Sequence, residues 1–249
     1  MIVYHPFANI NSLVFIEFLC YYHNRREKPE CSRVPAFFVS YFLARIINLD
    51  CRYLQLPWGN EDTAKILEIL AKQDVKVTFF MTGGWVESYP DDVKAILAAG
   101  HDLGNHSENH KNMSQLSDAE KKEELMKVHE KVRELTGYEM FLFRPPYGDY
   151  DNAVVNVAKD CGYYTIQWDV DSLDWKDYGV DSIIKTVTEH KHLGNGSIIL
   201  CHNGAKYTAQ ALDMLIAKLK NEGYTFVPIS ELIYKDKYHM NHEGRQVKN

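Results

Sequence analysis

The chain has 249 residues, which is enough for one large α/β domain or two small ones. Its hydrophobic content of 45% and charged content of 25% are ordinary for a soluble globular protein, and the formal net charge of -6 argues against a nucleic-acid partner. No uncharged apolar run reaches about 18 residues, so we expect no transmembrane helix. Five cysteines without a Cys-x-x-Cys pair argue against a disulfide framework and exclude a cysteine-rich zinc site.

The character of the chain changes near Trp58. Residues 1–57 are rich in aromatic side chains, and their apolar runs have neither a helical nor a strand period. No export signal is readable there, because the apolar run Leu13–Tyr22 carries Glu17 and no basic region precedes it. We therefore expect residues 1–57 to be an atypical N-terminal segment, either mistranslated or disordered.

From residue 58 to residue 235, strand patterns alternate with helical patterns. The longest helix begins with a capping-box pattern at Ser117–Glu120, and Asn60 or Asp62 caps the first helix. This alternation predicts a parallel sheet or a (β/α) barrel, with functional residues at the carboxyl ends of the strands. We expect the polar tail 236–249 to be frayed. The expected strands are 75–80, 101–106, 141–143, 164–168, 197–200 and 226–228, and the expected helices are 64–70, 91–99, 117–135, 152–161, 180–190, 209–221 and 231–233.

Two histidines, His106 and His110, follow the expected strand 101–106. A single helical turn after Ser107 would place both rings on one side, and two neutral imidazoles suit Zn²⁺. A pair with this spacing also arises by chance in a chain with 11 histidines, as two polar residues at a strand–loop junction. The other motifs must decide between these interpretations.

Arg144 and His202 also follow expected strands. Arg144 precedes two prolines that cannot donate hydrogen bonds, so the Tyr147 N–H can point at a ligand; the alternative is a rigid turn with a surface arginine. His202 ends the apolar run that contains Leu200, where it can serve as a general acid or be a satisfied strand-end histidine.

Three aspartates, Asp169, Asp171 and Asp174, lie between Trp168 and Trp175. Clustered carboxylates beside aromatic rings suggest a polar site with a sugar-stacking wall. The alternative is a loop whose aspartates cap the next helix.

Taken in order, these motifs resemble those of the polysaccharide deacetylases of the NodB-homology type, carbohydrate esterase family 4. The resemblance covers about residues 58–235. The runs 58–63 and 197–203 look like the branch related to peptidoglycan deacetylases of spore-forming bacteria. The matching motifs are His-Ser-x-x-His at 106–110, Arg-Pro-Pro-Tyr at 144–147, Asp-Ser-x-Asp-Trp at 171–175 and Leu-x-His at 200–202.

The resemblance implies a distorted (β/α) barrel and the removal of acetyl groups from N-acetylated amino sugars with a divalent metal, Zn²⁺ or alternatively Co²⁺. It implies that His106 and His110 bind the metal, which polarises the acetamide carbonyl. The other implied roles are oxyanion stabilisation and substrate contact by Tyr147, Trp175 and Leu200, protonation of the departing amine by His202, tuning of this histidine by Asp174, and orientation of the catalytic base by Arg144.

The family's first motif is a strand end Thr-Phe-Asp-Asp-Gly or, in the branch with Trp-Gly, Phe-Asp-x-x-Trp-Gly, and it has no counterpart just before Trp58. Gln55 stands three residues before Trp58, and an amide cannot act as a general base at neutral pH. Asp50, eight residues before Trp58, is expected to be too far away for the same register, and Asp62 is expected to be a helix cap. Three explanations remain open: a wrong reading frame for residues 1–57, a divergent pseudoenzyme, or a changed loop that brings Asp50 or another carboxylate to the site.

We therefore expect a metal-dependent deacetylase of cell-wall amino sugars that is weakly active or inactive in this form. The alternative is a non-catalytic glycan-binding protein of the same fold. The implied partner is a carbohydrate polymer, either peptidoglycan or a chitin-like oligosaccharide. Family members act outside the cytoplasmic membrane, in the cell wall or spore envelope, and we expect a monomer.

Overall fold

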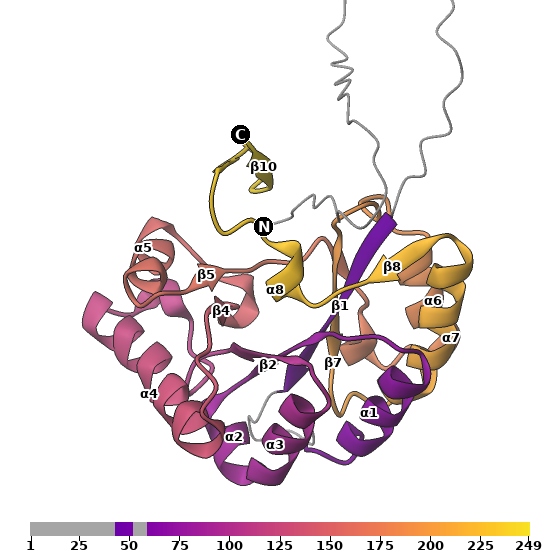
Figure 1. Ribbon diagram of the computed structural model, residues 1–249, viewed down its shortest axis with the longest axis horizontal. Helices are drawn as coiled ribbons and strands as arrows, with labels where there is room; N and C mark the ends of the chain where they lie inside the picture. Colours follow the sequence, from indigo (N-terminus) through magenta and orange to yellow (C-terminus); the bar gives the residue numbers. More distant parts are fainter. Residues whose placement is uncertain (1–42, 52–58) are drawn as a thin grey trace, which may run out of the picture. The chain divides into compact units, whose positions relative to one another are not determined.

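The computed structural model describes residues 43–51 and 59–249. Its centre is a parallel sheet with the strand order β5-β4-β3-β2-β1-β7-β6, and β8 pairs with the start of β1 (Figure 1). This arrangement confirms the α/β class predicted from the alternating pattern. The strands are β1 (Leu43–Cys51), β2 (Thr78–Met81), β3 (Asp102–Asn105), β4 (Leu142–Phe143), β5 (Tyr164–Thr165), β6 (Val170–Asp171), β7 (Ile198–His202) and β8 (Tyr224–Phe226).

The two ends of this strand order lie close together in the chain. β5 and β6 stand at opposite ends of the order, yet only residues 166–169 separate Thr165 from Val170. The Cα–Cα steps between these two residues span at most about 19 Å, whereas strands laid flat in this order would extend over about 29 Å. The sheet must therefore curl until its edges approach, which gives the distorted (β/α) barrel expected from the family resemblance.

Strand β1 corrects the expectation that the folded domain begins at residue 58. It pairs with β2 from Asn48 to Cys51 and with β7 from Ile46 to Asp50, so it lies in the middle of the sheet. A central parallel strand has no alternating pattern, and both of its partners are distant in sequence, so the local pattern did not reveal it. The prediction for residues 1–42 and 52–58 lies outside the described residues.

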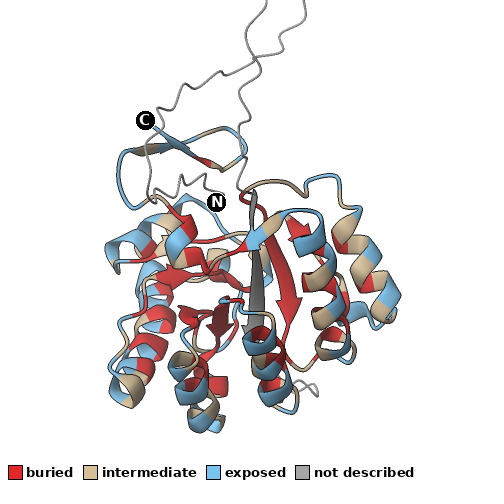
Figure 2. Ribbon diagram, turned by 45° about the vertical axis from the view of Figure 1, so that its right-hand side comes forward, coloured by how far each residue is buried: buried red, intermediate tan, exposed pale blue. Residues whose placement is uncertain are grey.

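Helices surround the sheet and turn their apolar faces towards it. In α7, Leu212, Leu215, Ile216 and Leu219 recur at helical spacing and are buried. Figure 2 shows the buried residues on the strands and on the inward faces of the helices. The helices are α1 (Thr63–Lys72), α2 (Gly83–Ser88), α3 (Pro90–Ala98), α4 (Asp118–Thr136), α5 (Asn152–Asp160), α6 (Val180–Thr188), α7 (Thr208–Asn221) and α8 (Ile229–Leu232).

The ends of α4 are fixed by its own sequence. The Ser117 hydroxyl accepts a hydrogen bond from the Glu120 N–H, and the Glu120 carboxylate accepts one from the Ser117 N–H, which confirms the predicted capping box. Gly137 ends the helix in the left-handed conformation, with φ 74°. At α1, Asp62 stands at the N-cap position as predicted, but its side chain makes no capping hydrogen bond.

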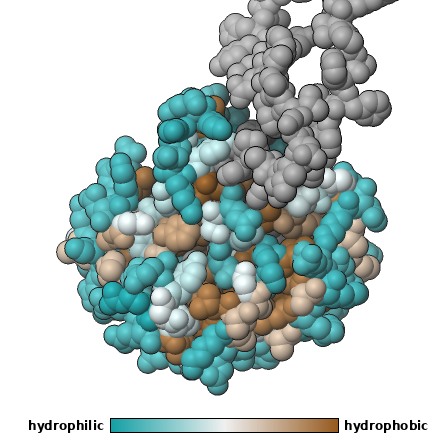
Figure 3. Space-filling view, in the orientation of Figure 1, coloured by the Kyte–Doolittle hydropathy of each residue, from teal (hydrophilic) through white to brown (hydrophobic). Residues whose placement is uncertain are grey.

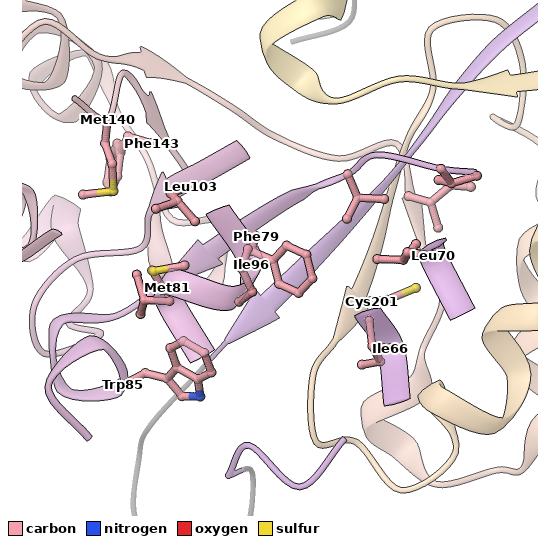
Figure 4. Close-up of a cluster of buried hydrophobic side chains, with 14 of the residues drawn as sticks. Ile66, Leu70, Phe79, Met81, Trp85, Ile96, Leu103, Met140, Phe143 and Cys201 are labelled. Carbon is pink, nitrogen blue, oxygen red and sulfur yellow. The ribbon is translucent and has the colours of Figure 1, made fainter. Parts of the chain in front are cut away.

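The main core lies between the sheet and the helices. Figure 4 shows Ile66 and Leu70 of α1, Phe79 and Met81 of β2, and Trp85 of α2 as part of this cluster. Each of these side chains is fully buried, and full burial of a large apolar side chain contributes about 1.5–3 kcal/mol to stability. Helices α1 and α2 and strand β2 are thereby held together in one core cluster.

The outer surface is mainly polar. On the face seen in Figure 3, hydrophilic residues cover most of the rim and hydrophobic residues gather towards the middle. Among the described helices, none is both long enough and apolar enough to cross a bilayer.

Helix α2 and strand β6 were not predicted from the sequence. Helix α2 begins with Gly83-Gly84, which have low helix propensity, and depends on capping of the Trp85 N–H by the Thr82 hydroxyl. Strand β6 has only two residues and is defined by pairing with β7.

The tail 236–249 forms an antiparallel hairpin of β9 (Tyr238–Met240) and β10 (Gln246–Lys248), so the expectation of a frayed end is wrong. The buried Gln246 side chain exchanges two hydrogen bonds with the backbone of Tyr234, and Arg245 pairs with Asp169 at 3.3 Å.

Candidate active site

The predicted site residues lie at or after the carboxyl ends of strands of one parallel sheet. His106 directly follows β3, Arg144 follows β4, Asp174 comes after β6, and His202 is the last residue of β7. Because all these strands are parallel, their carboxyl ends meet at one edge of the sheet. The placement predicted from sequence is therefore the one observed.

His106 is fully buried and is held in one tautomer. Its Nδ1 lies 2.6 Å from the carbonyl oxygen of Arg144. A carbonyl can only accept, so Nδ1 carries the proton and Nε2 carries the lone pair. In metal-binding histidines, a hydrogen bond from the ring nitrogen that does not bind the metal typically orients the ring.

His110 lies beside His106, with ring centroids 4.8 Å apart and planes at 73°. The expected helical turn after Ser107 is absent. Instead, Ser107 and His110 both have positive φ values, of 66° and 52°, and the Ser107 hydroxyl accepts a hydrogen bond from the His110 N–H at 3.0 Å. Two left-handed residues within four positions bring the rings together by a strained loop.

Asp174 and His202 form a buried pair. Asp174 Oδ1 lies 2.6 Å from His202 Nδ1, and Oδ2 accepts hydrogen bonds from the His202 N–H and the Thr208 hydroxyl, both at 2.6 Å. Burial works to raise the pKa of Asp174, but the charge and hydrogen bonds of His202, together with the Thr208 hydroxyl, outweigh it and hold the pKa below its usual value. The ionised carboxylate holds the His202 ring by Nδ1, so proton exchange with a bound molecule falls to Nε2.

Arg144 is fully buried, and its guanidinium carbon lies 4.6 Å from the centre of the Phe80 ring. It is therefore not the surface arginine of the alternative interpretation. Burial lowers the pKa of Arg144, and the charge of Asp171 opposes this shift. Asp171 in turn accepts hydrogen bonds from the Leu173 N–H at 2.9 Å and the Trp175 indole at 3.4 Å.

Aromatic side chains stand at the outer side of the site. Tyr147 is 56% exposed and its ring centroid is 4.6 Å from that of His110, while Trp175 is 45% exposed. His110 and Tyr147 also line a pocket of ≈ 640 Å³, together with Lys111, Asn112, Gln115 and Leu116. Leu200, by contrast, is buried within β7.

Asp169 is not part of the site. It accepts a hydrogen bond from the Ile198 N–H and pairs with Arg245 of the hairpin, so it has a structural role away from Asp174. The cluster of three aspartates thus separates into one that anchors the hairpin and two that belong to the site.

The two imidazoles fit a divalent metal such as Zn²⁺ as two of its ligands, because His106 presents its lone pair at Nε2 beside the ring of His110. Among residues 59–249, whose side chains the structure describes, no group of three or more histidine, cysteine, aspartate or glutamate side chains is assembled around one point.

The backbone of β1 places Asp50 at this edge. Asp50 is in register with His202 of β7 and with Phe80 of β2, and Cys51 is in register with Met81. The expectation that Asp50 is too far from the first-motif position is thus corrected: strand pairing, and not the distance to Trp58, determines where β1 ends. Gln55 lies outside the described residues.

Sequence reasoning missed residues that hold the site residues in place. Thr208, at the start of α7, bonds to Asp174 from a position 34 residues away. Asn105 accepts a hydrogen bond from the Ser107 N–H and donates to the Leu125 carbonyl and the Tyr163 hydroxyl. The position of Asn105 near the end of a predicted strand was the signal that the sequence offered, and it did not reveal these partners because they are distant.

A family model described as polysaccharide deacetylase matches residues 49–166, and the match begins one residue before Asp50. A peptidoglycan-N-acetylglucosamine deacetylase of Bacillus cereus is 39% identical over 69% of this chain and 81% of that protein. The uncharacterized protein YlxY of Bacillus subtilis is 37% identical over 72% of this chain but 56% of its own length, so the chain spans little more than half of that relative.

A solved structure of a CE4 family pseudoenzyme from Bacillus anthracis matches with a TM-score of 0.71 at 37% identity, over 77% of this chain and 65% of that one. A mutant of the same pseudoenzyme with restored enzymatic activity matches with a TM-score of 0.71 at 38% identity, over 77% and 67%. The fold is thus that of the NodB-type deacetylases. The chain belongs to the polysaccharide deacetylase family, carbohydrate esterase family 4.

Proposed function

We propose that this protein hydrolyses the N-acetyl groups of amino sugars in a peptidoglycan-type polymer, outside the cytoplasmic membrane, with a divalent metal held by His106 and His110. The observation that carries the proposal is the buried Asp174–His202 pair at the same sheet edge as the two histidines. Relatives named as peptidoglycan deacetylases support the substrate class.

Each residue has a defined task in this reaction. When bound, the metal polarises the acetamide carbonyl and lowers the pKa of a bound water. His202 protonates the departing amine through Nε2, and Asp174 stabilises the resulting imidazolium. The Tyr147 N–H supports the oxyanion, and the exposed ring of Trp175 stacks against a sugar.

The general base is the weak part of this arrangement. The register of β1 makes Asp50 the candidate carboxylate, with Arg144 as the cation that orients it. However, the Thr-Phe-Asp-Asp-Gly form of the family's first motif has two adjacent aspartates, and here Asp50 is followed by Cys51. We therefore propose that turnover is impaired.

A second function deserves a test, because structural neighbours of this chain include a protein described as a CE4 family pseudoenzyme. In that case the same site would bind glycan without hydrolysis. The aromatic residues Tyr147 and Trp175 would serve binding alone.

The deciding experiment measures acetate release from N-acetylglucosamine oligomers and from peptidoglycan with added Zn²⁺, for the wild type and for His202→Ala. Zn²⁺-dependent release that His202→Ala abolishes supports the deacetylase. Equal glycan affinity in both proteins without hydrolysis in either would support the glycan-binding function instead.

A further inference from the structure

The loop that carries His110 is attached to helix α4, one turn beyond the capping box. The contact is made by Glu124, whose side chain is 5% exposed although it is charged. A buried carboxylate is costly unless it is well bonded, so the partners of Glu124 indicate what it does.

These partners are the two neighbours of His110. One carboxylate oxygen of Glu124 accepts a hydrogen bond from the Asn109 N–H at 2.7 Å, and the other accepts one from the Asn109 side-chain amide at 2.8 Å. Lys111 Nζ lies 3.0 Å from the same carboxylate. Glu124 therefore holds the residues on both sides of His110.

Helix α4 makes further contacts with the same loop. The backbone carbonyl of Glu124 accepts a hydrogen bond from the Glu108 N–H at 3.0 Å, and Lys131 pairs with the Glu108 carboxylate at 2.5 Å. Five contacts thus join residues 108, 109 and 111 to Glu124 and Lys131 of this long, well-capped helix.

The loop needs such an attachment because its conformation is unfavourable. Ser107 and His110 are both left-handed, at φ 66° and 52°. Non-glycine residues remain in this region only where surrounding contacts enforce it. Without them, the loop would relax and the His110 ring would leave its place beside His106.

We propose that Glu124 is a positioning residue for metal binding, which holds His110 in its left-handed conformation before the metal arrives. This inference rests on the proposed metal-dependent function. Residues that orient metal ligands from outside typically contribute about 10- to 100-fold to metal affinity, and this is the range expected for Glu124.

The test uses Co²⁺ alone as the probe, with affinity and the visible absorption spectrum of the bound ion measured by titration of the full chain. Glu124→Ala should weaken Co²⁺ binding by about tenfold or more and change the spectrum. Glu124→Gln should recover most of the affinity, because its carbonyl oxygen still accepts from the Asn109 N–H.

Glu123→Gln is the matched control, because Glu123 is on the same helix, is 60% exposed and pairs with Lys127. It should bind Co²⁺ like the wild type. The thermal midpoint of the metal-free proteins separates a general loss of stability from a specific loss of binding.

Two outcomes would overturn the inference: a metal-free Glu124→Ala protein that is destabilised but binds Co²⁺ with wild-type affinity and spectrum, or a wild type that binds no Co²⁺. If Glu124→Ala does not fold, Asn109→Ala removes only the 2.8 Å side-chain bond, and unchanged Co²⁺ affinity there refutes the proposal. If Co²⁺ binding depends on Glu124 but no acetate is released, the proposed function fails and this inference stands.

Discussion

Replacing Asp174 by asparagine tests the role of the buried carboxylate. The carboxylate accepts three hydrogen bonds, two from His202 and one from Thr208, each at 2.6 Å. Asparagine has one carbonyl oxygen, so its NH₂ group must face at least one of these donors. If the carbonyl keeps the His202 N–H and the Thr208 hydroxyl, the NH₂ group faces His202 Nδ1 and forces the ring into the other tautomer.

The loss corresponds to one charge-assisted hydrogen bond, which contributes about 1.5–3 kcal/mol. We expect the free energy of unfolding to fall by that amount. Because the imidazolium form of His202 also loses its counter-charge, we expect kcat/KM for acetate release to fall by about 10- to 150-fold.

Urea unfolding and acetate release from an N-acetylglucosamine oligomer measure the two effects. Thr208→Val is the control, since it removes one bond to Asp174 but leaves both contacts with His202. It should cost about 1.5–3 kcal/mol of stability, because this bond is also made to the charged carboxylate, with little change in kcat/KM. Unchanged stability in Asp174→Asn, or equal rate losses in both variants, would refute the reasoning.

Three further variants test other parts of the structure. Burial, and to a smaller extent Lys76, lowers the pKa of His101 from 6.5 to about 4. The unfolded chain therefore binds the proton more tightly, and stability is lost as pH falls from 6.5 towards 4, by at most about 3 kcal/mol. Unfolding curves of His101→Asn, which can still accept from the Val77 N–H, should show a smaller loss of stability over this pH range, and an unchanged dependence of stability on pH would contradict this. Asp50→Asn should abolish the remaining acetate release while keeping the thermal midpoint, and retained turnover would show that another carboxylate is the base. Arg245→Ala removes the pair with Asp169, so limited proteolysis should cut the 238–248 hairpin faster than the rest of the domain; equal rates would show that Gln246 is a sufficient anchor.

Predictions from sequence succeeded where the cause is local. The capping box at Ser117 and Glu120 needs only residues three positions apart, and the structure confirms it. They failed where conformation depends on distant contacts. The loop from Ser107 to His110 was expected to form a helical turn, but both residues are left-handed, and the intervening Asn109 bonds to the distant Glu124 of α4.

The sequence by itself determined most of the order of strands and helices after residue 58, the α/β class and four site motifs, because periodicity, capping residues and motif spacing are properties of neighbouring residues. Only the tertiary structure decided that β1 is the central strand and that Asp50 stands in register with His202, because that pairing joins segments about 150 residues apart. It also decided that Asp174, and not Asp169, bonds to His202, since three carboxylates in one loop are distinguished only by which distant donors each one meets.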